Sequence, residues 1–158
     1  MHKHLSRLEH VWLEWPVYFV TTCTFQRRQI LTSPDVAKIL VNEWTDSRIR
    51  HGWAIGRYVI MRDHVHFFCF AEQDAVSLER FVQRWKEWTS KRITRELGIQ
   101  QPIWQKEFFD HVLRSEESHA EKWEYVRDNP VRAALATKWS DWPFIGEIFD
   151  LEFRRGAT

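Results

Sequence analysis

The sequence has few of the residues that break a chain or staple it together. Its 158 residues include only 5 glycines and 5 prolines, which excludes a collagen-like or linker-type chain. Two cysteines, Cys23 and Cys69, are too few for a disulfide framework, and because both lie in apolar runs we expect buried free thiols. The longest apolar runs fall well short of the ~20 residues that span a bilayer, and no signal peptide is visible. We therefore expect a cytoplasmic protein with no membrane partner.

An excess of charge of one sign is also lacking. Lys plus Arg is 23 and Asp plus Glu is 22, so the net charge of +1 gives no support to a polyanionic partner. A hydrophobic content of 44% and a length of 158 residues indicate one folded domain. Tryptophan, in contrast, is plentiful at 10 residues, which predicts a stacking surface besides the core. Helical spacing favours the core for Trp44, Trp85 and Trp88, so Trp139 and Trp142 are the candidates for stacking, against bases or against the domain.

Hydrophobic periodicity and helix-start and helix-stop residues indicate four strands and two long helices. The strands are predicted over residues 16–25, 53–61, 64–71 and 108–113, and the helices over 34–51 and 77–97. This β-α-β-β-α-β order is typical of a ferredoxin-like α+β fold, an antiparallel sheet with helices on one face. A helix over 116–128, a short helix over 131–137 and an irregular arm follow. We expect a single domain over 1–137 and a C-terminal tail over 138–158 that packs on it.

Two histidines lie at the start of the third predicted strand, in His64-Val65-His66. Residues two apart in a strand point to the same face, so both imidazoles face one side of the sheet. Two neutral imidazoles this close are half of a metal site, and they need a third ligand from elsewhere. The alternative is a pair of surface histidines without a metal.

Tyr125 and Asn129 are four residues apart in the helix predicted from Glu116, so they share a helix face. The amide oxygen of Asn129 would complete the coordination of a divalent cation, and Tyr125 would attack a phosphodiester that the cation polarises. The alternatives are a Tyr125 that belongs to the core and an Asn129 that only caps the helix that Pro130 begins.

Basic residues gather on the second long helix. Between Glu79 and Arg95 there are two acidic residues and six basic ones, which are Arg80, Arg84, Lys86, Lys91, Arg92 and Arg95. Trp85 and Trp88 are interleaved with them. Basic side chains neutralise phosphates and aromatic faces stack on unpaired bases, so this helix is a candidate DNA surface. A solvated helix face is the alternative. Arg27 and Arg28, after the first strand, form a second cationic pair.

Three blocks of sequence, in order, resemble a known family. Residues 61–68 (Met-Arg-Asp-His-Val-His-Phe-Phe) are similar to the His-hydrophobic-His block of the single-tyrosine HUH transposases. Residues 104–105 and 108–114 are similar to their next block, and residues 125–133 (Tyr-Val-Arg-Asp-Asn-Pro-Val-Arg-Ala) to their tyrosine helix. The last two blocks most resemble the REP-associated tyrosine transposases.

The resemblance implies an enzyme that cuts and rejoins single-stranded DNA at hairpins of REP-like palindromes. It implies that Tyr125 is the nucleophile and forms a 5′-phosphotyrosine link, and that His64, His66 and Asn129 hold Mg²⁺ or Mn²⁺. Lys86 matches a lysine of the family's second helix, which implies a contact with DNA. It also implies a bacterial, nucleoid-associated protein, and we expect a monomer, with a homodimer as the alternative.

Arg62-Asp63 departs from this family pattern, because many relatives have Pro-Asn before the first histidine. Arg62 adds a further candidate phosphate contact to Arg27, Arg28 and Lys91, and Asp63 is either a turn residue or a neighbour of the metal. The main alternative function is a catalytically silent, domesticated binder of structured single-stranded DNA. A paired-histidine phosphodiesterase needs two His-x-Ser/Thr motifs, which the sequence lacks, and HUH replication initiators are typically longer chains.

Overall fold

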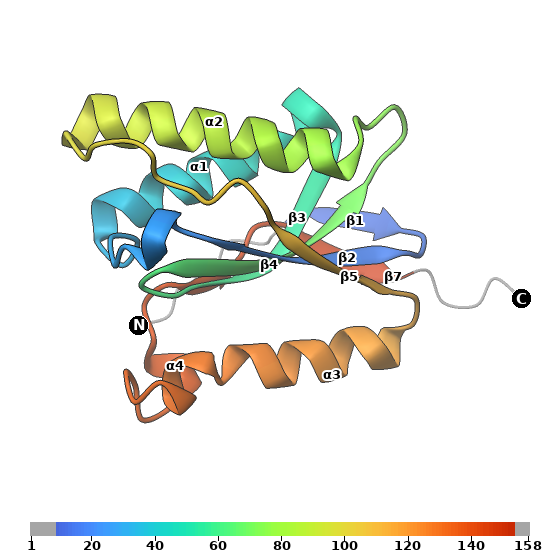
Figure 1. Ribbon diagram of the computed structural model, residues 1–158. Coiled ribbons are helices and arrows are strands. Elements are labelled where there is room, and N and C mark those ends of the chain that lie inside the picture. The colour runs from blue at the N-terminus through green and yellow to red at the C-terminus, as the bar shows by residue number, and fades with distance from the viewer. Residues whose placement is uncertain (1–8, 154–158) are drawn as a thin grey trace, which may run out of the picture.

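The chain folds around a five-stranded antiparallel sheet in the order β5-β2-β4-β3-β6 (Figure 1). The computed structural model describes residues 9–153. The strands of the sheet are β2 (Val17–Cys23), β3 (Trp53–Ile60), β4 (His64–Ala71), β5 (Phe109–Leu113) and β6 (Ile145–Glu147). The helices are α1 (Pro34–His51), α2 (Leu78–Leu97), α3 (Glu116–Arg127) and the short α4 (Asn129–Arg132), with 3-10 turns η1 (Phe25–Arg27) and η2 (Trp139–Asp141). The order of β2 to β5 confirms the ferredoxin-like prediction, and β6 extends that sheet by one strand.

The sheet separates two apolar layers. Helices α1 and α2 cover one face, as predicted, and α3 lies across the other face with the short α4 after it (Figure 1). Phe67 belongs to the core under α1 and α2, whereas its neighbour Phe68 belongs to the core under α3, because successive strand residues alternate faces. None of the helices within residues 9–153 is long and apolar enough to cross a membrane. The sequence-based expectation of no signal peptide concerns the chain start, and residues 1–8 lie outside the described range.

Both long helices begin and end at the residues that the sequence indicates. The Ser33 side chain accepts a hydrogen bond from the backbone N–H of Val36 and caps α1, and Ser77 caps α2 in the same way. Gly52 (φ 79°) ends α1 and Gly98 (φ 71°) ends α2, both in the left-handed conformation that glycine adopts without strain.

The C-terminal part differs from the sequence-based prediction. Helix α4 ends at Arg132, so the helix expected over 131–137 is wrong: Ala134 takes φ 59°, and the N–H of Leu135 bonds back to the carbonyl of Pro130. The arm expected to be irregular contains β6 and β7 (Asp150–Phe153), and β7 pairs in parallel with β1 (His10–Leu13) in a second, two-stranded sheet. The last five tail residues, 154–158, lie outside the described range.

The tryptophans divide between core and surface differently from the helical spacing. Trp44 and Trp85 are buried and stacked, with ring centroids 5.0 Å apart. Trp88 is 45% exposed under the guanidinium of Arg50, so its assignment to the core is wrong. In the tail, Trp139 packs edge-on against Trp123 of α3, and the Trp142 Nε1–H donates to the carbonyl of Ile60. The described part of the tail therefore packs on the domain with its indoles. Cys23 and Cys69 are free and buried, as predicted.

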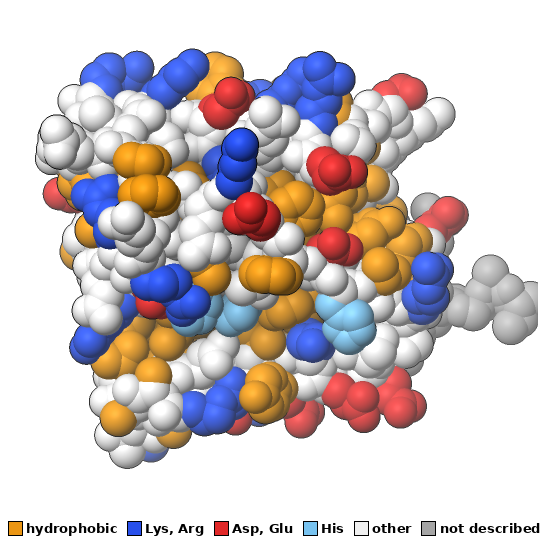
Figure 2. All heavy atoms as spheres, viewed as in Figure 1, with side chains coloured by type: hydrophobic (Ala, Val, Ile, Leu, Met, Phe, Trp, Pro, Cys, Tyr) orange, Lys and Arg blue, Asp and Glu red, His pale blue; other side chains and the backbone are white. Residues whose placement is uncertain are grey.

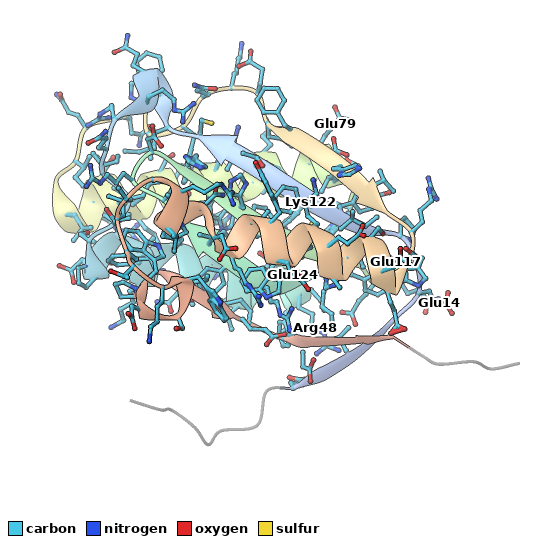
Figure 3. The ribbon with its side chains drawn as sticks, turned by 90° about the horizontal axis from the view of Figure 1, so that it is seen from below. Glu14, Arg48, Glu79, Glu117, Lys122 and Glu124 are labelled. Carbon is cyan, nitrogen blue, oxygen red and sulfur yellow. The ribbon has the colours of Figure 1, made fainter. Side chains whose placement is uncertain are left out.

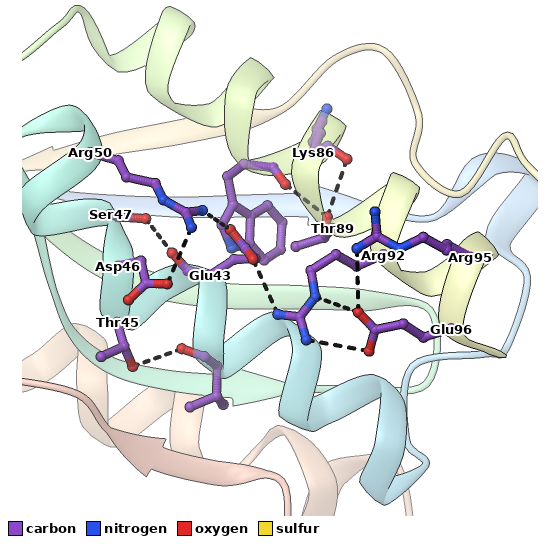
Figure 4. Close-up of polar contacts among 12 residues, drawn as sticks. Glu43, Thr45, Asp46, Ser47, Arg50, Lys86, Thr89, Arg92, Arg95 and Glu96 are labelled. Atoms are coloured by element: carbon purple, nitrogen blue, oxygen red, sulfur yellow. Dashed lines mark hydrogen bonds and ion pairs between the residues drawn. The ribbon is translucent and has the colours of Figure 1, made fainter.

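A buried carboxylate joins the two long helices (Figure 4). Glu43 of α1 is only 6% exposed, and it accepts hydrogen bonds from Arg50 of the same helix and from Arg92 of α2. Removing either arginine would leave a buried charge short of a partner. Part of the basic character of α2 is therefore used inside the fold.

His119 of α3 makes stability depend on pH. Burial, with a smaller contribution from Arg57, lowers the pKa of His119 to about 4. The unfolded chain takes up this proton near pH 6.5, so stability is full above that pH and falls between pH 6.5 and 4, by up to about 1.4 kcal/mol per pH unit. Urea unfolding followed by tryptophan fluorescence should show a shallower pH dependence for His119→Gln. His111→Gln, at an exposed histidine, is the control, and equal slopes in the wild type and His119→Gln would contradict the assignment.

Candidate active site

The paired histidines lie side by side at the start of β4. The ring centroids of His64 and His66 are 4.9 Å apart, and the rings are nearly perpendicular. Both share the sheet face of Phe68, which is the face that α3 covers. The predicted alternation of His64-Val65-His66 is confirmed, since Val65 is buried in the opposite core.

Each imidazole is oriented by a polar neighbour at its Nδ1 atom. Asp63 Oδ1 lies 2.8 Å from His64 Nδ1, and Thr21 Oγ1 of β2 lies 2.7 Å from His66 Nδ1. A carboxylate only accepts, so His64 carries its proton on Nδ1 and its Nε2 lone pair remains for a ligand. Asp63 accepts a further hydrogen bond of 2.9 Å from Arg27 Nε. Such outer partners fix the ring orientation of metal-ligating histidines.

The electrostatics at His66 favour a neutral imidazole. Burial, followed by the charges of His64, Lys122 and Arg132, lowers the pKa of His66 to about 3. A neutral imidazole is the form that ligates metals. Burial on its own raises the pKa of Asp63, but the hydrogen bonds from Arg27 and His64 outweigh it and hold that pKa below the usual value.

Tyr125 and Asn129 lie at the junction of α3 and α4. Ser115 and Ser118 form a capping box at the start of α3, and Tyr125 near its end is 64% exposed. Asn129 is the first residue of α4. Arg132 ties the two together: its guanidinium carbon lies 4.0 Å from the Tyr125 ring centroid, Nη1 donates to the Tyr125 carbonyl and Nη2 donates to Asn129 Oδ1 at 2.7 Å.

His64 and the residues that follow α4 border the same cavity. This cavity of about 210 Å³ is lined by Arg62, Asp63 and His64 on one side and by Ala133 and Leu135, after α4, on the other. Figure 2 shows histidine side chains between the level of the sheet and that of α3, with Lys and Arg side chains beside them. Within residues 9–153 no three His, Cys, Asp or Glu side chains are placed to hold a metal. A metal site here needs a different third donor, and the Asn129 amide stays the predicted one.

The predicted DNA-contact residues do not form one cluster. Arg62 is exposed at the cavity, and Arg27 next to it is paired with Asp63. Arg28 donates to the carbonyls of Gln100 and Pro102 and so fastens the chain after α2. Lys91 is exposed beside a groove of about 560 Å³ between α2 and residues 101–108, on the α2 side of the sheet.

Lys86 lines the same groove but is buried, and its ammonium is engaged. Its Nζ donates to the carbonyls of Gln105, Lys106 and Glu107 at 2.7, 3.2 and 2.7 Å. Burial lowers the pKa of Lys86 to about 8. The side chain therefore holds the segment that leads into β5, and its contact with DNA stays a prediction.

Sequence reasoning missed three residues of this site: Thr21, Lys122 and Arg132. Thr21 meets His66 through the β2–β4 register, which no local pattern reveals. Helical spacing would have found the others, because Lys122 is three residues before Tyr125 and Arg132 is three after Asn129. Figure 3 shows Lys122 on the side of α3 that faces β2.

A ferredoxin-like sheet with paired histidines opposite a tyrosine-bearing helix defines the class of single-tyrosine transposases. Residues 16–129 match the family model described as "Transposase IS200 like". The chain therefore belongs to the IS200-like transposase family, which confirms the prediction of a DNA transposase.

Two relatives agree with this family. A REP-associated tyrosine transposase of Escherichia coli (strain K12) is 27% identical over 140 residues, covering 88% of this chain and 79% of that protein. The structure of a REP-associated tyrosine transposase bound to a REP hairpin aligns with a TM-score of 0.69 at 21% identity, covering 89% of this chain and 82% of that one. The resemblance to REP-associated tyrosine transposases read from the motifs is confirmed.

The contacts of Lys86 predict a structural role that can be measured. Lys86→Met keeps the apolar stem but leaves three carbonyls without their donor, so we expect the free energy of unfolding to fall by about 2 kcal/mol. Urea unfolding measures this, and hydrogen exchange at the amide of Gln105, which bonds to Cys23, should accelerate. Lys91→Met, at an exposed lysine of the same helix, is the matched control. An unchanged midpoint for Lys86→Met would refute the structural role.

Proposed function

We propose that this transposase cuts and rejoins single-stranded DNA at hairpins through a covalent 5′-phosphotyrosine formed by Tyr125. The observation that carries the proposal is the exposed phenol of Tyr125, whose ring contacts Arg132, a residue close enough to His66 for its charge to help lower the pKa of that imidazole. An exposed nucleophile near a pair of potential metal-binding imidazoles is an arrangement suited to covalent phosphoryl transfer.

In the proposed reaction, the Tyr125 Oη atom forms a bond to phosphorus and the bond from phosphorus to the 3′ oxygen breaks. The phenol proton passes to solvent and the leaving oxygen takes up a proton, which gives a 3′-hydroxyl. The tyrosine ester keeps the energy of the broken phosphodiester. Attack by a second 3′-hydroxyl therefore reverses the step on another strand without ATP.

His64, His66 and Asn129 would hold the divalent cation of the proposed site. IS200-like transposases are generally metal dependent. The Asn129 oxygen already accepts from Arg132, but an amide oxygen has two lone pairs, so one remains for a metal. When bound, Mg²⁺ or Mn²⁺ would polarise the attacked phosphodiester, and imidazole donors favour Mn²⁺ of the two.

We propose a hairpin of a REP-like palindrome as the DNA partner, because a structural neighbour is bound to a REP hairpin. The exposed Arg62 at the cavity and Lys91 at the α2 groove are the first candidate phosphate contacts. Arg27, Arg28 and Lys86 are further candidates, although each already has a partner within the fold. We further propose a monomer with one domain over 1–137 and a tail over 138–158. The packing of Trp139 on Trp123 supports a tail that docks on its own domain.

The nucleophile assignment is tested by Tyr125→Phe. The exposed ring keeps its place under Arg132, so folding should be unaffected, while cleavage of a labelled REP-type hairpin with single-stranded flanks should fall by at least about 10³-fold. Denaturing gels would also lose the protein–DNA adduct. Binding should persist, and this separates the enzyme from the silent binder. Cleavage by Tyr125→Phe at the wild-type rate would exclude Tyr125 as nucleophile.

The metal proposal predicts an effect of Asp63. Asp63→Asn removes the charge that orients His64, so we expect Mn²⁺ affinity to fall about tenfold. Titration followed by Mn²⁺ electron paramagnetic resonance measures this without relying on activity. His64→Ala should abolish binding at this site, and Asp110→Asn, at an exposed residue of β5, is the control. Unaltered affinity in His64→Ala would place the metal elsewhere.

A further inference from the structure

Lys122 is a cation on an acidic helix. Within α3 the acidic residues are Glu116, Glu117, Glu121 and Glu124, against Lys122 and Arg127. Figure 3 shows Lys122 on the side of α3 that faces β2, with Glu124 pointing elsewhere. Arg127 lies over the ring of Trp139 in the tail, so Lys122 is the helix's cation on the β2 side.

The Lys122 ammonium lies close to the paired histidines. Its Nζ is 5.1 Å from the ring centroid of Phe19, and the ring of Phe19 stacks on that of His66 at 5.2 Å. The charge of Lys122 contributes to the low pKa of His66, which agrees with this proximity.

Lys122 also shares a helix face with the proposed chemistry. Lys122 and Tyr125 stand at positions i and i+3 of α3, so their side chains are neighbours on one face of that helix. Asn129 follows in α4, after the break at Asp128.

Two of the arginines near the site have other partners. Arg27 is paired with Asp63, and Arg132 bonds to Asn129 and to the Tyr125 carbonyl. For Lys122, the part of the chain that the structure describes records no hydrogen bond or ion pair, and its contact is the face of Phe19. A ring face leaves the charge of the ammonium uncompensated.

We propose that Lys122 binds a non-bridging oxygen of the phosphodiester that Tyr125 attacks. The inference rests on the proposed function and adds a phosphate-binding residue to it. The ligand class is a single phosphodiester anion. An ammonium fixed beside it orients the phosphorus toward the phenol and stabilises the negative charge that grows on the phosphoryl oxygens.

The test measures DNA binding without cleavage or metal. In a Tyr125→Phe background with EDTA, fluorescence anisotropy compares Lys122→Met and Lys122→Arg on a labelled REP-type hairpin with single-stranded flanks. Lys122→Met should bind roughly tenfold more weakly at low salt, and the slope of log affinity against log salt should shrink by about 0.7. Lys122→Arg should restore most of the affinity. Lys38→Met, at an exposed lysine of α1 across the sheet, should bind like the parent.

A methylphosphonate scan identifies the phosphate concerned. Neutralising one phosphate should weaken binding by the parent but not by Lys122→Met, and that phosphate should be the one that active protein links to Tyr125. An unchanged salt slope in Lys122→Met, or coupling to a different phosphate, overturns the inference even where cleavage depends on Tyr125. Cleavage that survives Tyr125→Phe instead overturns the proposed function, so the two failures are distinguishable.

Discussion

The antiparallel pairing of β2 with β4 is the constraint on which both the core and the site depend. Its register sets Thr21 opposite His66 and Cys23 opposite His64. A slip of one residue would turn both histidines into the core under α1 and α2, where Val65 and Phe67 now lie. The same alternation that gives each face its apolar layer therefore places the two imidazoles on the face that α3 covers. Because a slip would also expose apolar side chains, the packing of the core fixes the positions of the histidines.

A consequence of this burial is that the His66 imidazole is held neutral among cations. His66 is desolvated beneath Phe19, and Lys122 and Arg132 oppose its protonation further. The site therefore has positive charge in its surroundings and an unprotonated donor, His66, at its centre. Such a site suits an anion that brings its own cation, and a phosphodiester with a divalent metal is that combination.

Most of the fold was readable from local signals, because caps, glycines and strand alternation act within a few residues. Ser33, Gly52, Ser77 and Gly98 bound the long helices where expected. The tail was not readable: β7 pairs with β1 from the other end of the chain, and local sequence does not encode such a partner. The α4 prediction failed because Ala134 takes a positive φ and the N–H of Leu135 bonds back to the carbonyl of Pro130, which ends the helix despite the high helix propensity of alanine.

The candidate site follows the same division between local and long-range information. The residues of each motif were found, but the contacts that set their roles cross between elements. The sequence predicts Lys86 as a surface cation, because a lysine in a basic helix usually is one. Its ammonium instead donates hydrogen bonds to backbone carbonyls some twenty residues later in the chain. Glu43 likewise takes Arg92 from the same basic face. The number of basic residues along a helix therefore overstates how many of them can contact DNA.

The net charge of +1 does not show how the positive charges are distributed, but the ion pairs within the fold do. Several basic residues of α1 and α2 are paired with buried or nearby carboxylates. These charges hold the helices together and add little positive electrostatic potential to that side of the molecule. Around the paired histidines the basic residues are Arg62, Lys122 and Arg132. The acidic residue there is Asp63, which already interacts with Arg27 and His64. We therefore expect attraction for DNA to be local to the proposed site, because a chain of nearly zero net charge can still bind a polyanion where positive charge is concentrated.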